Sequence, residues 1–477
     1  MITIDFEKKG KFGLSEFIYI SIKEQILNGK LNANYKLPSK RTFAEHLGVS
    51  IITIQNAYNQ LICEGYIYSL EKKGYFVTDI SLEPSIKQNH KKDFFNHSER
   101  KKENAELYKK EELLIDFTNN STSAQKFPFN LWAHILRQVL NSSDEKLLQR
   151  IDAKGIFELR KAISSYLLEF RNMDVSPEQI IIASGTETLY TILSQLLDEQ
   201  TIFAVENPGY HKVEKIFRIN HKNCYPIQID EQGIIIQELE KSKAEVVHVC
   251  PTHHFPTGII MPVKRRLELL TWAENSKNHY IIEDDYDSEF RFNGKPLQTL
   301  FSYDKNNKVI YINTFSKTLT PSLRISYMIL PQQLLDSFNK KLGFYSCTVS
   351  AFEQFALANF INQGFFGKHI IRMKNYYRSL RNALIQSLQN SKIAPKIQIK
   401  EEDSGLHFLL QIDSIKTKDE LQKDLLSQGI KISLLSDFYY LDSTKSEIQQ
   451  EKIFLINYSG IKKEQIPIFI KKLESVL

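Results

Sequence analysis

From about residue 113 onward, short apolar runs alternate with longer amphipathic segments. Runs of four or five residues rich in Ile and Val are typical of strands buried on both faces, and the segments between them have helical spacing. The runs lie at 180–183, 201–205, 246–249, 280–283 and 309–313. This alternation predicts an α/β domain built on a parallel sheet that is covered by helices.

A charged segment divides the chain, whose 477 residues are too many for a single core. Residues 81–112 are rich in Lys, Glu and Asn and poor in large apolar side chains, which is the composition of a solvated linker. We therefore expect one domain at 1–80 and another at 113–477. Because the pattern becomes helix-rich after about residue 345, the second domain should have a large lobe at 113–345 and a small C-terminal lobe at 346–477.

The cysteines and the charge exclude several classes of protein. Four cysteines are scattered at 63, 224, 250 and 347 without paired spacing, which argues against a disulfide framework or a zinc site and fits a reducing cytoplasm. No apolar stretch is long enough to span a bilayer. The formal net charge of +6 permits an anionic partner but does not identify one.

The first eighty residues have the pattern of a DNA-binding helix-turn-helix. Residues 17–27 have apolar side chains at helical spacing, Ser39 can cap a second helix, and Ser50 follows a glycine turn and can cap a third. The third helix would enter the major groove and present Thr53, Gln55, Asn56 and Asn59 as polar candidates. Two strands then surround a turn with Lys72 and Lys73, and such a wing can place both lysines on phosphates.

The same region resembles the winged-helix domain of the GntR family, which binds double-stranded DNA operators. The matching stretches are LPSKRTFAEHLGVS at 37–50 and AYNQLICEGY at 57–66. The resemblance implies contacts to the DNA backbone or bases from Ser39, Lys40, Arg41, Ser50 and Thr53. One departure is that this chain has Ile51 where the family usually has Arg, which would shift specificity to Arg41, Gln55 and Asn56.

Lys317 follows the apolar run at 309–313, and the chain supplies every contact that pyridoxal phosphate needs. That cofactor requires a lysine for a Schiff base, a carboxylate at the ring nitrogen, a hydroxyl at the phenolate oxygen, an aromatic ring against its face, and amides with a cation around its phosphate. The candidates, in that order, are Lys317, Asp284, Tyr286, Tyr210 and a phosphate cradle of Ser184, Gly185, Thr186, Thr314, Ser316 and Arg324. Together, at the ends of predicted strands, they predict a cofactor site.

Residues 113–477 resemble the fold-type I class I/II aminotransferases, and the whole chain resembles the MocR/GabR group of GntR regulators. The matching motifs are FPTG at 255–258, EDDYDSEFR at 283–291 and NTFSKTLTPSLR at 313–324. The resemblance implies pyridoxal phosphate as cofactor and a homodimer. It also favours Asp284 over Asp285 at the ring nitrogen, a choice that the residues by themselves leave open.

Two departures concern the ligand. Many aminotransferases have Asn where this chain has Phe255, a change that the regulator group shares. Class I aminotransferases usually bind the substrate carboxylate with an Arg near the C-terminus, but no Arg follows Arg381 here. Lys212, which stands where a GABA-sensing relative has Arg, and Lys431 are the remaining candidate cations for the effector. The effector therefore need not be GABA.

The sequence thus favours a cytoplasmic, homodimeric transcriptional regulator that binds an operator and senses a small amino compound, or pyridoxal phosphate itself, through Lys317. A ligand can do so only by binding two states with different affinity. Two alternatives remain open. One is a working aminotransferase with an accessory DNA-binding head, and the other is a repressor whose aminotransferase-like domain serves only as a dimerisation scaffold.

Overall fold

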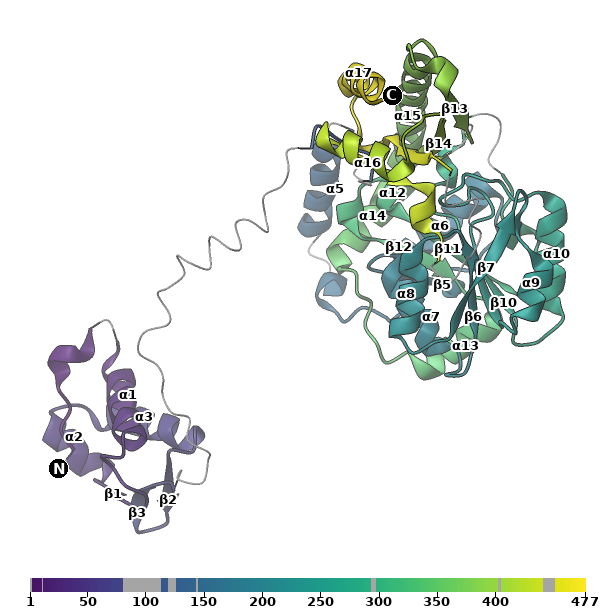
Figure 1. Cartoon of the computed structure of the whole chain (residues 1–477). Coiled ribbons are helices and arrows are strands. Elements are labelled where there is room, and N and C mark those ends of the chain that lie inside the picture. Colours follow the sequence, from purple (N-terminus) through teal and green to yellow (C-terminus); the bar gives the residue numbers. More distant parts are fainter. Residues whose placement is uncertain are drawn as a thin grey trace. The chain divides into compact units, whose positions relative to one another are not determined.

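A computed structural model describes residues 2–10, 12–79, 113–118, 126–142, 145–292, 297–401, 405–440 and 451–477. The chain divides into two compact units, Met1–Lys109 and Lys110–Leu477 (Figure 1). The linker expected at 81–112 lies outside the described residues. Within those residues, no helix has the length and apolar character needed to cross a bilayer.

The first unit is a winged helix-turn-helix, as the sequence predicts. Its elements are a 3-10 turn at Phe6–Lys9, helices α1 (Leu14–Leu27), α2 (Lys40–Leu47) and α3 (Ile51–Cys63), and strands β1 (Lys36–Leu37), β2 (Ile67–Leu70) and β3 (Gly74–Val77). Ser39 and Ser50 cap α2 and α3, since their hydroxyls accept the backbone N–H of Thr42 and Thr53 at 3.2 and 3.1 Å. Gly48 ends α2 with a φ of 66°, a conformation that glycine adopts without strain.

A small apolar core holds the first unit together. The helices and the antiparallel sheet, in the order β1-β3-β2, bury the inner face of α3 together with side chains of α1 and α2. Ile22, Phe43, Ile54 and Tyr58 have no exposed surface. The opposite face of α3 stays exposed, which is the arrangement that a groove-reading helix requires.

An eight-stranded sheet forms the centre of the second unit, in the order β5-β12-β11-β10-β9-β6-β7-β8. Its strands are β5 (Ile180–Ala183), β6 (Phe203–Asn207), β7 (Cys224–Asp230), β8 (Gly233–Ile234), β9 (Val246–Val249), β10 (Tyr280–Asp284), β11 (Val309–Thr314) and β12 (Ser326–Ile329). All run parallel except β8 and β12, which are antiparallel to their neighbours. The expectation of a parallel sheet misses β12, because its short connection from β11 cannot make a parallel crossover.

Helices cover both faces of this sheet (Figure 1). One face packs against α7 (Thr186–Leu196), α8 (His211–Ile219) and α13 (Gln332–Lys341). The other face packs against α9 (Ile236–Lys241) and α10 (Val263–Glu274) at one end, and against α5 (Phe129–Asn141), α6 (Phe157–Arg171) and α14 (Ala351–Asn362) at the other. Short helices α11 (Leu300–Tyr303) and α12 (Phe315–Thr318) flank β11.

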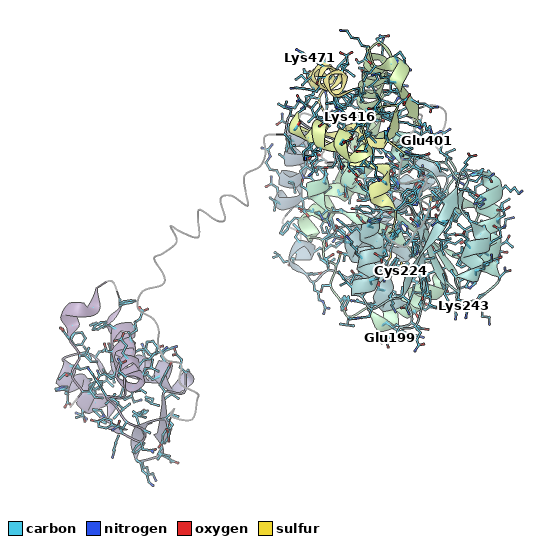
Figure 2. The ribbon with its side chains drawn as sticks, viewed as in Figure 1. Glu199, Cys224, Lys243, Glu401, Lys416 and Lys471 are labelled. Carbon is cyan, nitrogen blue, oxygen red and sulfur yellow. The ribbon has the colours of Figure 1, made fainter. Side chains whose placement is uncertain are left out.

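The C-terminal lobe is an antiparallel sheet in the order β13-β14-β17-β16, covered by helices. Its elements are α15 (Phe365–Gln389), β13 (Ile397–Lys400), β14 (His407–Ile412), α16 (Lys418–Ser427), β15 (Ile430–Lys431), β16 (Ser433–Leu434), β17 (Ile453–Asn457) and α17 (Ile466–Val476). Figure 2 labels Lys416 and Lys471 on this lobe, and Glu199 and Lys243 at the far end of the same unit.

The two lobes interleave in sequence. Strand β4 (Ile115–Asp116) pairs with β15, and its neighbour Phe117 packs into the core of the C-terminal lobe. In the other direction, α14 packs into the core of the large lobe although it lies after residue 345. Helix α15 spans both lobes, since Phe366 contacts the large-lobe core and Met373 the C-terminal core.

Candidate functional site

A cavity of about 250 Å³ lies where the two lobes of the second unit meet, at the carboxyl ends of β9, β10 and β11. In open α/β sheets this edge is where ligands bind. The large lobe supplies most of its lining, and the C-terminal lobe adds Leu406, His407 and Asn457. A ligand in the cavity would therefore contact both lobes.

The structure gathers most of the predicted site residues around this cavity. Those that line it are Thr186, Tyr210, Lys212, Asp284, Tyr286, Thr314, Ser316, Lys317 and Arg324. Ser184 and Gly185 do not line it but join β5 to α7 directly beside Arg324. Lys431 does not belong to the site, because it is an exposed residue of β15, which pairs with β4.

Lys317 lies on α12, immediately after the central strand β11. Removal of water from around the amine lowers the pKa of Lys317 to about 8, although the charge of Asp287 opposes this shift. At pH 7 about one molecule in ten then carries the neutral amine, far more than for a lysine in water. This side chain is therefore suited to attack an aldehyde.

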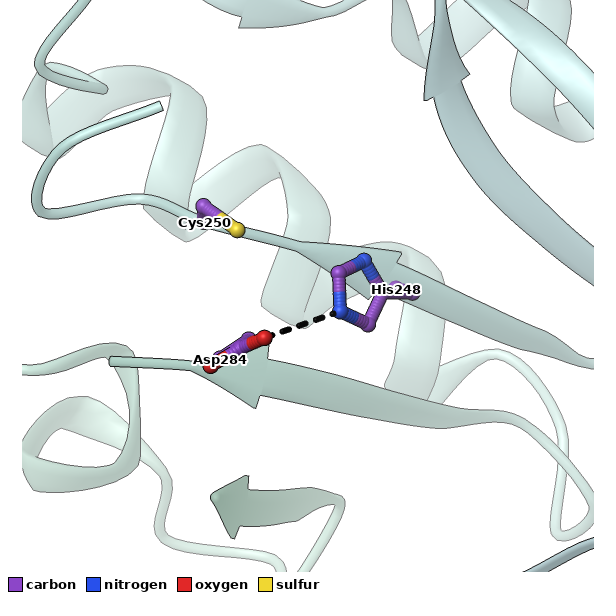
Figure 3. Close-up of side chains that lie close together, drawn as sticks. All are labelled: His248, Cys250 and Asp284. Carbon is purple, nitrogen blue, oxygen red and sulfur yellow. Dashed lines mark ion pairs between the residues drawn. The ribbon is translucent and has the colours of Figure 1, made fainter. Parts of the chain in front are cut away.

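Asp284 ends β10 with one carboxylate oxygen committed and the other open. Tyr190 donates a hydrogen bond of 2.7 Å to its Oδ2, and Nε2 of His248 lies 3.6 Å from the same atom (Figure 3). Oδ1 is buried, and no donor among the described residues reaches it. A buried carboxylate oxygen needs a donor, so this atom fits the N–H of a protonated ring nitrogen in the cavity.

Asp285 has a different environment and does not line the cavity. It is fully buried, and its Oδ2 accepts bonds from Arg171 at 2.5 Å and Tyr311 at 2.6 Å. Thr252 donates to its Oδ1 at 2.5 Å. These partners satisfy both oxygens, so of the two adjacent carboxylates only Asp284 offers an open acceptor to a ligand.

Tyr286 belongs to a buried polar cluster beside Lys317. Its hydroxyl lies 3.2 Å from Nδ1 of His253, which in turn lies 2.9 Å from Oδ2 of Asp287. The ring of His407 packs against His253 with 4.5 Å between centroids. Burial holds the pKa of His407 well below its usual value, and the charges of His253 and Lys317 act in the same direction, so His407 is neutral.

A second group of charges lies at the N-terminus of α7, where backbone N–H groups favour an anion. Arg324 forms an ion pair with Glu187, and Lys212 binds the other oxygen of the same carboxylate at 2.8 Å. Burial opposes ionisation of Glu187, but hydrogen bonds from Lys212 and Arg324 lower its pKa, so it is charged. A side chain on Gly185 would meet the guanidinium of Arg324, and the positive φ of Gly185, 94°, also favours glycine.

Aromatic and aliphatic side chains form the remaining wall. The ring of Tyr210 is half-exposed and meets Phe255 edge-on at 5.7 Å. Phe255 also packs against a cluster of Leu409, Leu435, Ile453 and Leu455. Ile453 and Leu455 of β17 thus belong to an apolar cluster beside the cavity.

The predicted DNA contacts lie on the surface of the first unit. Arg41 is exposed and pairs with Glu45 at 3.5 Å, and Nζ of Lys40 lies 5.9 Å from the Tyr75 ring. Gln55 and Asn56 are exposed on α3, and Lys72 and Lys73 are exposed at the turn between β2 and β3. The hydroxyls of Ser39 and Ser50, which cap α2 and α3, also lie 2.7 and 2.8 Å from the hydroxyls of Thr42 and Thr53.

Several residues of the site escape the sequence reasoning. His248 is a polar residue inside the apolar run at 246–249, and Glu187 directly follows the predicted phosphate-binding residues 184–186. Both could therefore have been recognised from their position in the sequence. Tyr190 is hidden in the apolar face of α7. His407 and Asn457 come from the C-terminal lobe, and no local pattern connects them to Lys317.

Comparisons with known proteins cover both units. The family model "Bacterial regulatory proteins, gntR family" matches residues 14–77, and "Aminotransferase class I and II" matches residues 114–473. Among solved structures, an archaeal alanine:glyoxylate aminotransferase has a TM-score of 0.68 at 24% identity, covering 79% of this chain and 93% of that chain. This likeness shows a fold-type I aminotransferase domain.

Several relatives align with this chain over nearly its whole length, through both units. The HTH-type transcriptional regulator YhdI of Bacillus subtilis strain 168 is 35% identical over 474 residues, which is 99% of this chain and 98% of that protein. The probable rhizopine catabolism regulatory protein MocR of Rhizobium meliloti is 31% identical over 449 residues, 93% and 90% of the two chains. The pyridoxine biosynthesis regulator PdxR of Corynebacterium glutamicum is 27% identical over 425 residues, 88% and 87%. The chain therefore belongs to the MocR-type GntR family of HTH transcriptional regulators, whose second domain is of the class I and II aminotransferase family.

Proposed function

We propose that this regulator binds pyridoxal phosphate at Lys317 and changes its action on DNA when an amino compound, or the cofactor itself, occupies the cavity. The observation that carries the proposal is the convergence of three groups in one cavity. These are an amine with a pKa of about 8, the open Oδ1 of Asp284, and a cation at a helix N-terminus, Arg324. Each fits a different part of the cofactor.

The residues around the cavity divide the binding task. Lys317 would hold the aldehyde carbon, Asp284 the ring nitrogen and Tyr286 the phenolate oxygen, while Tyr210 would lie against the ring face. The phosphate would accept hydrogen bonds from the backbone N–H groups at the N-terminus of α7. The residues around it would be Ser184, Gly185, Thr186, Thr314, Ser316 and Arg324. Pyridoxal phosphate supplies an aldehyde that bonds covalently to amines and a ring that withdraws electrons from that bond.

The shape of the cavity supports a sensing role. Because both lobes line it, a ligand that binds there with different affinity in two lobe arrangements would shift the balance between them. Relatives are named as regulators of rhizopine catabolism and of pyridoxine biosynthesis, which supports an amino compound or the cofactor as effector. Lys212 lies at the cavity and is the remaining candidate for an effector's negative group, although it is paired with Glu187.

The DNA partner is a double-stranded operator, read by α3 with support from the β2–β3 wing. We also infer a homodimer, so that two heads read two half-sites. Phe129, Leu148 and Phe344 are large apolar side chains that stay exposed on the second unit, where a second copy could cover them.

The proposal is tested by trapping the cofactor on the full-length protein. Borohydride reduction in the presence of pyridoxal phosphate should leave a pyridoxyl group on the peptide that contains Lys317, and Lys317→Ala should abolish it. DNA binding of the reduced protein and of Lys317→Ala should no longer respond to amino compounds. Labelling elsewhere, or an unchanged response in Lys317→Ala, would overturn the sensing role and favour a dimerisation scaffold.

A second candidate function, transamination, is favoured by the same reactive amine. Lys317 with a pKa of about 8 could move a proton at neutral pH, which turnover requires. Steady consumption of an amino donor with a keto acid would support an aminotransferase. A ligand-induced change that persists when the keto acid is added would support a sensor.

A further inference from the structure

The recognition helix of the first unit presents an apolar surface at its start. Ile51 is 47% exposed and Ile52 is 70% exposed, although both lie in the first turn of α3. The core of the unit does not use them, because the inner face of the same helix is formed by Ile54, Ala57 and Tyr58. Single exposed apolar side chains are common on protein surfaces. The exposure of Ile51 and Ile52 therefore becomes informative only through the surface to which they belong.

The outer face of α3 has a restricted chemistry. Ile52, Gln55, Asn56 and Asn59 are exposed and three or four residues apart, so they form one stripe along the helix. The whole helix, IITIQNAYNQLIC, has no Arg, Lys, Asp or Glu. It therefore has no guanidinium or ammonium group for guanine O6 and N7, and no carboxylate for the cytosine amino group.

The groups that are present match one kind of base pair. Amide side chains such as Gln55 and Asn56 can bond adenine N6 and N7 with two hydrogen bonds, and an apolar side chain can contact the C5 methyl of thymine. The cap by Ser50 fixes the first turn, so Ile51 and Ile52 are held at the end of the helix that approaches base edges. The exposed cations Arg41, Lys72 and Lys73 lie outside α3. Lys72 and Lys73 suit phosphates, and Arg41, on α2, remains a candidate base contact outside this helix.

We propose that α3 reads A·T pairs, with Ile52 and Ile51 contacting thymine methyl groups and Gln55 and Asn56 bonding adenine. This rests on the proposed DNA binding and adds the class of operator sequence. The half-site under α3 contains thymine at the positions that face the first turn, and the usual arginine–guanine contact is absent from this helix.

The test begins with selection of duplexes from a random pool by the full-length protein. The selected half-sites should have A·T pairs at the positions that α3 covers. Replacing each thymine there by deoxyuridine removes one methyl and keeps every hydrogen-bonding group. We expect affinity to fall about fourfold at each contacted thymine, the value of one buried CH₂ group.

A variant assigns the methyl contact to a residue. In Ile52→Ala, thymine and deoxyuridine duplexes should bind equally at the position that Ile52 contacts, while Leu27→Ala, which trims an exposed leucine of α1, should behave as the wild type. In Ile51→Ala, thymine and deoxyuridine duplexes should likewise bind equally at the position that Ile51 contacts. Because Ile52 is 70% exposed, its truncation should leave the thermal unfolding midpoint unchanged.

Each outcome bears on the inference. G·C pairs at the positions that α3 covers would overturn it. So would a loss of affinity with deoxyuridine that persists in both isoleucine variants. Failure to select any sequence at all would instead count against the proposed DNA-binding regulator, so the two failures are distinguishable.

Discussion

Tyr190 and Asp284 are joined by a hydrogen bond of 2.7 Å that orients the carboxylate at the end of β10. The phenol occupies Oδ2, and Oδ1 remains buried and open. Because burial raises the pKa of Tyr190, the phenol keeps its proton and always donates. The pair therefore positions a charged acceptor for a ring N–H at a fixed place in the cavity.

Asp284→Asn should weaken binding of pyridoxal phosphate without unfolding the protein. The amide has the same size but loses the charge that holds a protonated ring nitrogen. A hydrogen bond to a charged group contributes about 1.5–3 kcal/mol, so affinity should fall by about ten- to a hundredfold. Equilibrium titration of the purified variant measures this, and an affinity equal to that of the wild type would show that Asp284 does not contact the ring.

Asp285→Asn provides the contrasting case, because the neighbouring carboxylate is structural. It pairs with the buried guanidinium of Arg171 at 2.5 Å. Breaking a buried pair leaves an uncompensated charge and costs about 3–5 kcal/mol. Urea unfolding should show this loss, whereas the folded fraction should bind pyridoxal phosphate with unchanged affinity. Equal stability of the two variants would contradict the assignment.

The fold and most of the site could be predicted from the sequence because their signals are local. Apolar runs mark the buried strands, and Lys317 and Asp284 follow two of them. No local signal shows that β4 pairs with β15 of the C-terminal lobe, or that α14 packs into the large lobe. Both contacts join segments that are far apart in the sequence. The choice between Asp284 and Asp285 also needs three dimensions, because Arg171 lies 114 positions away from Asp285.

The capture of pyridoxal phosphate should depend on pH with a midpoint near 8. Neutral Lys317 would be the nucleophile, and its pKa of about 8 means that its reactive fraction reaches one half at about pH 8 and levels off roughly one pH unit higher. Asp287→Asn should move the midpoint lower, since the charge of Asp287 raises the pKa of Lys317. Stopped-flow absorbance measures the rate, with Nα-acetyl-lysine as a control that keeps accelerating toward pH 10. A protein rate that also keeps rising would contradict the lowered pKa.

The same lysine should affect stability in a predictable direction. The folded pKa of Lys317 is below the unfolded value, so between about pH 8 and 10.5 the unfolded state binds more protons and stability rises with pH. The destabilisation is complete below pH 8. Lys317→Met should therefore raise the free energy of unfolding more at pH 7 than at pH 10, as measured by urea unfolding at both values. An equal gain at both pH values would rule out the proposed linkage.

Glu187→Gln should strengthen the binding of pyridoxal phosphate. The carboxylate of Glu187 shares the cations Arg324 and Lys212 and would lie close to a phosphate bound at the N-terminus of α7. Two unit charges 4 Å apart interact by about 1 kcal/mol in water and by more where water is excluded, so affinity should rise by about fivefold or more. Pyridoxal, which lacks the phosphate, is the matched control and should bind both proteins equally. A tighter complex with both ligands would indicate a change in shape and not in charge.

The wing lysines should account for part of the salt dependence of DNA binding. Lys72 and Lys73 are exposed at the β2–β3 turn, where a wing contacts phosphates. Each neutralised phosphate releases counterions and contributes about 0.9 to the slope of log affinity against log salt. Replacing both lysines by Ala should therefore reduce the slope by about 2 and weaken binding to all sequences alike. Lys471→Ala, which removes an exposed lysine from α17 of the other unit, should leave the slope unchanged (Figure 2). If the double variant keeps the full slope, the wing does not touch the backbone, and the phosphate contacts must come from Lys40 and Arg41.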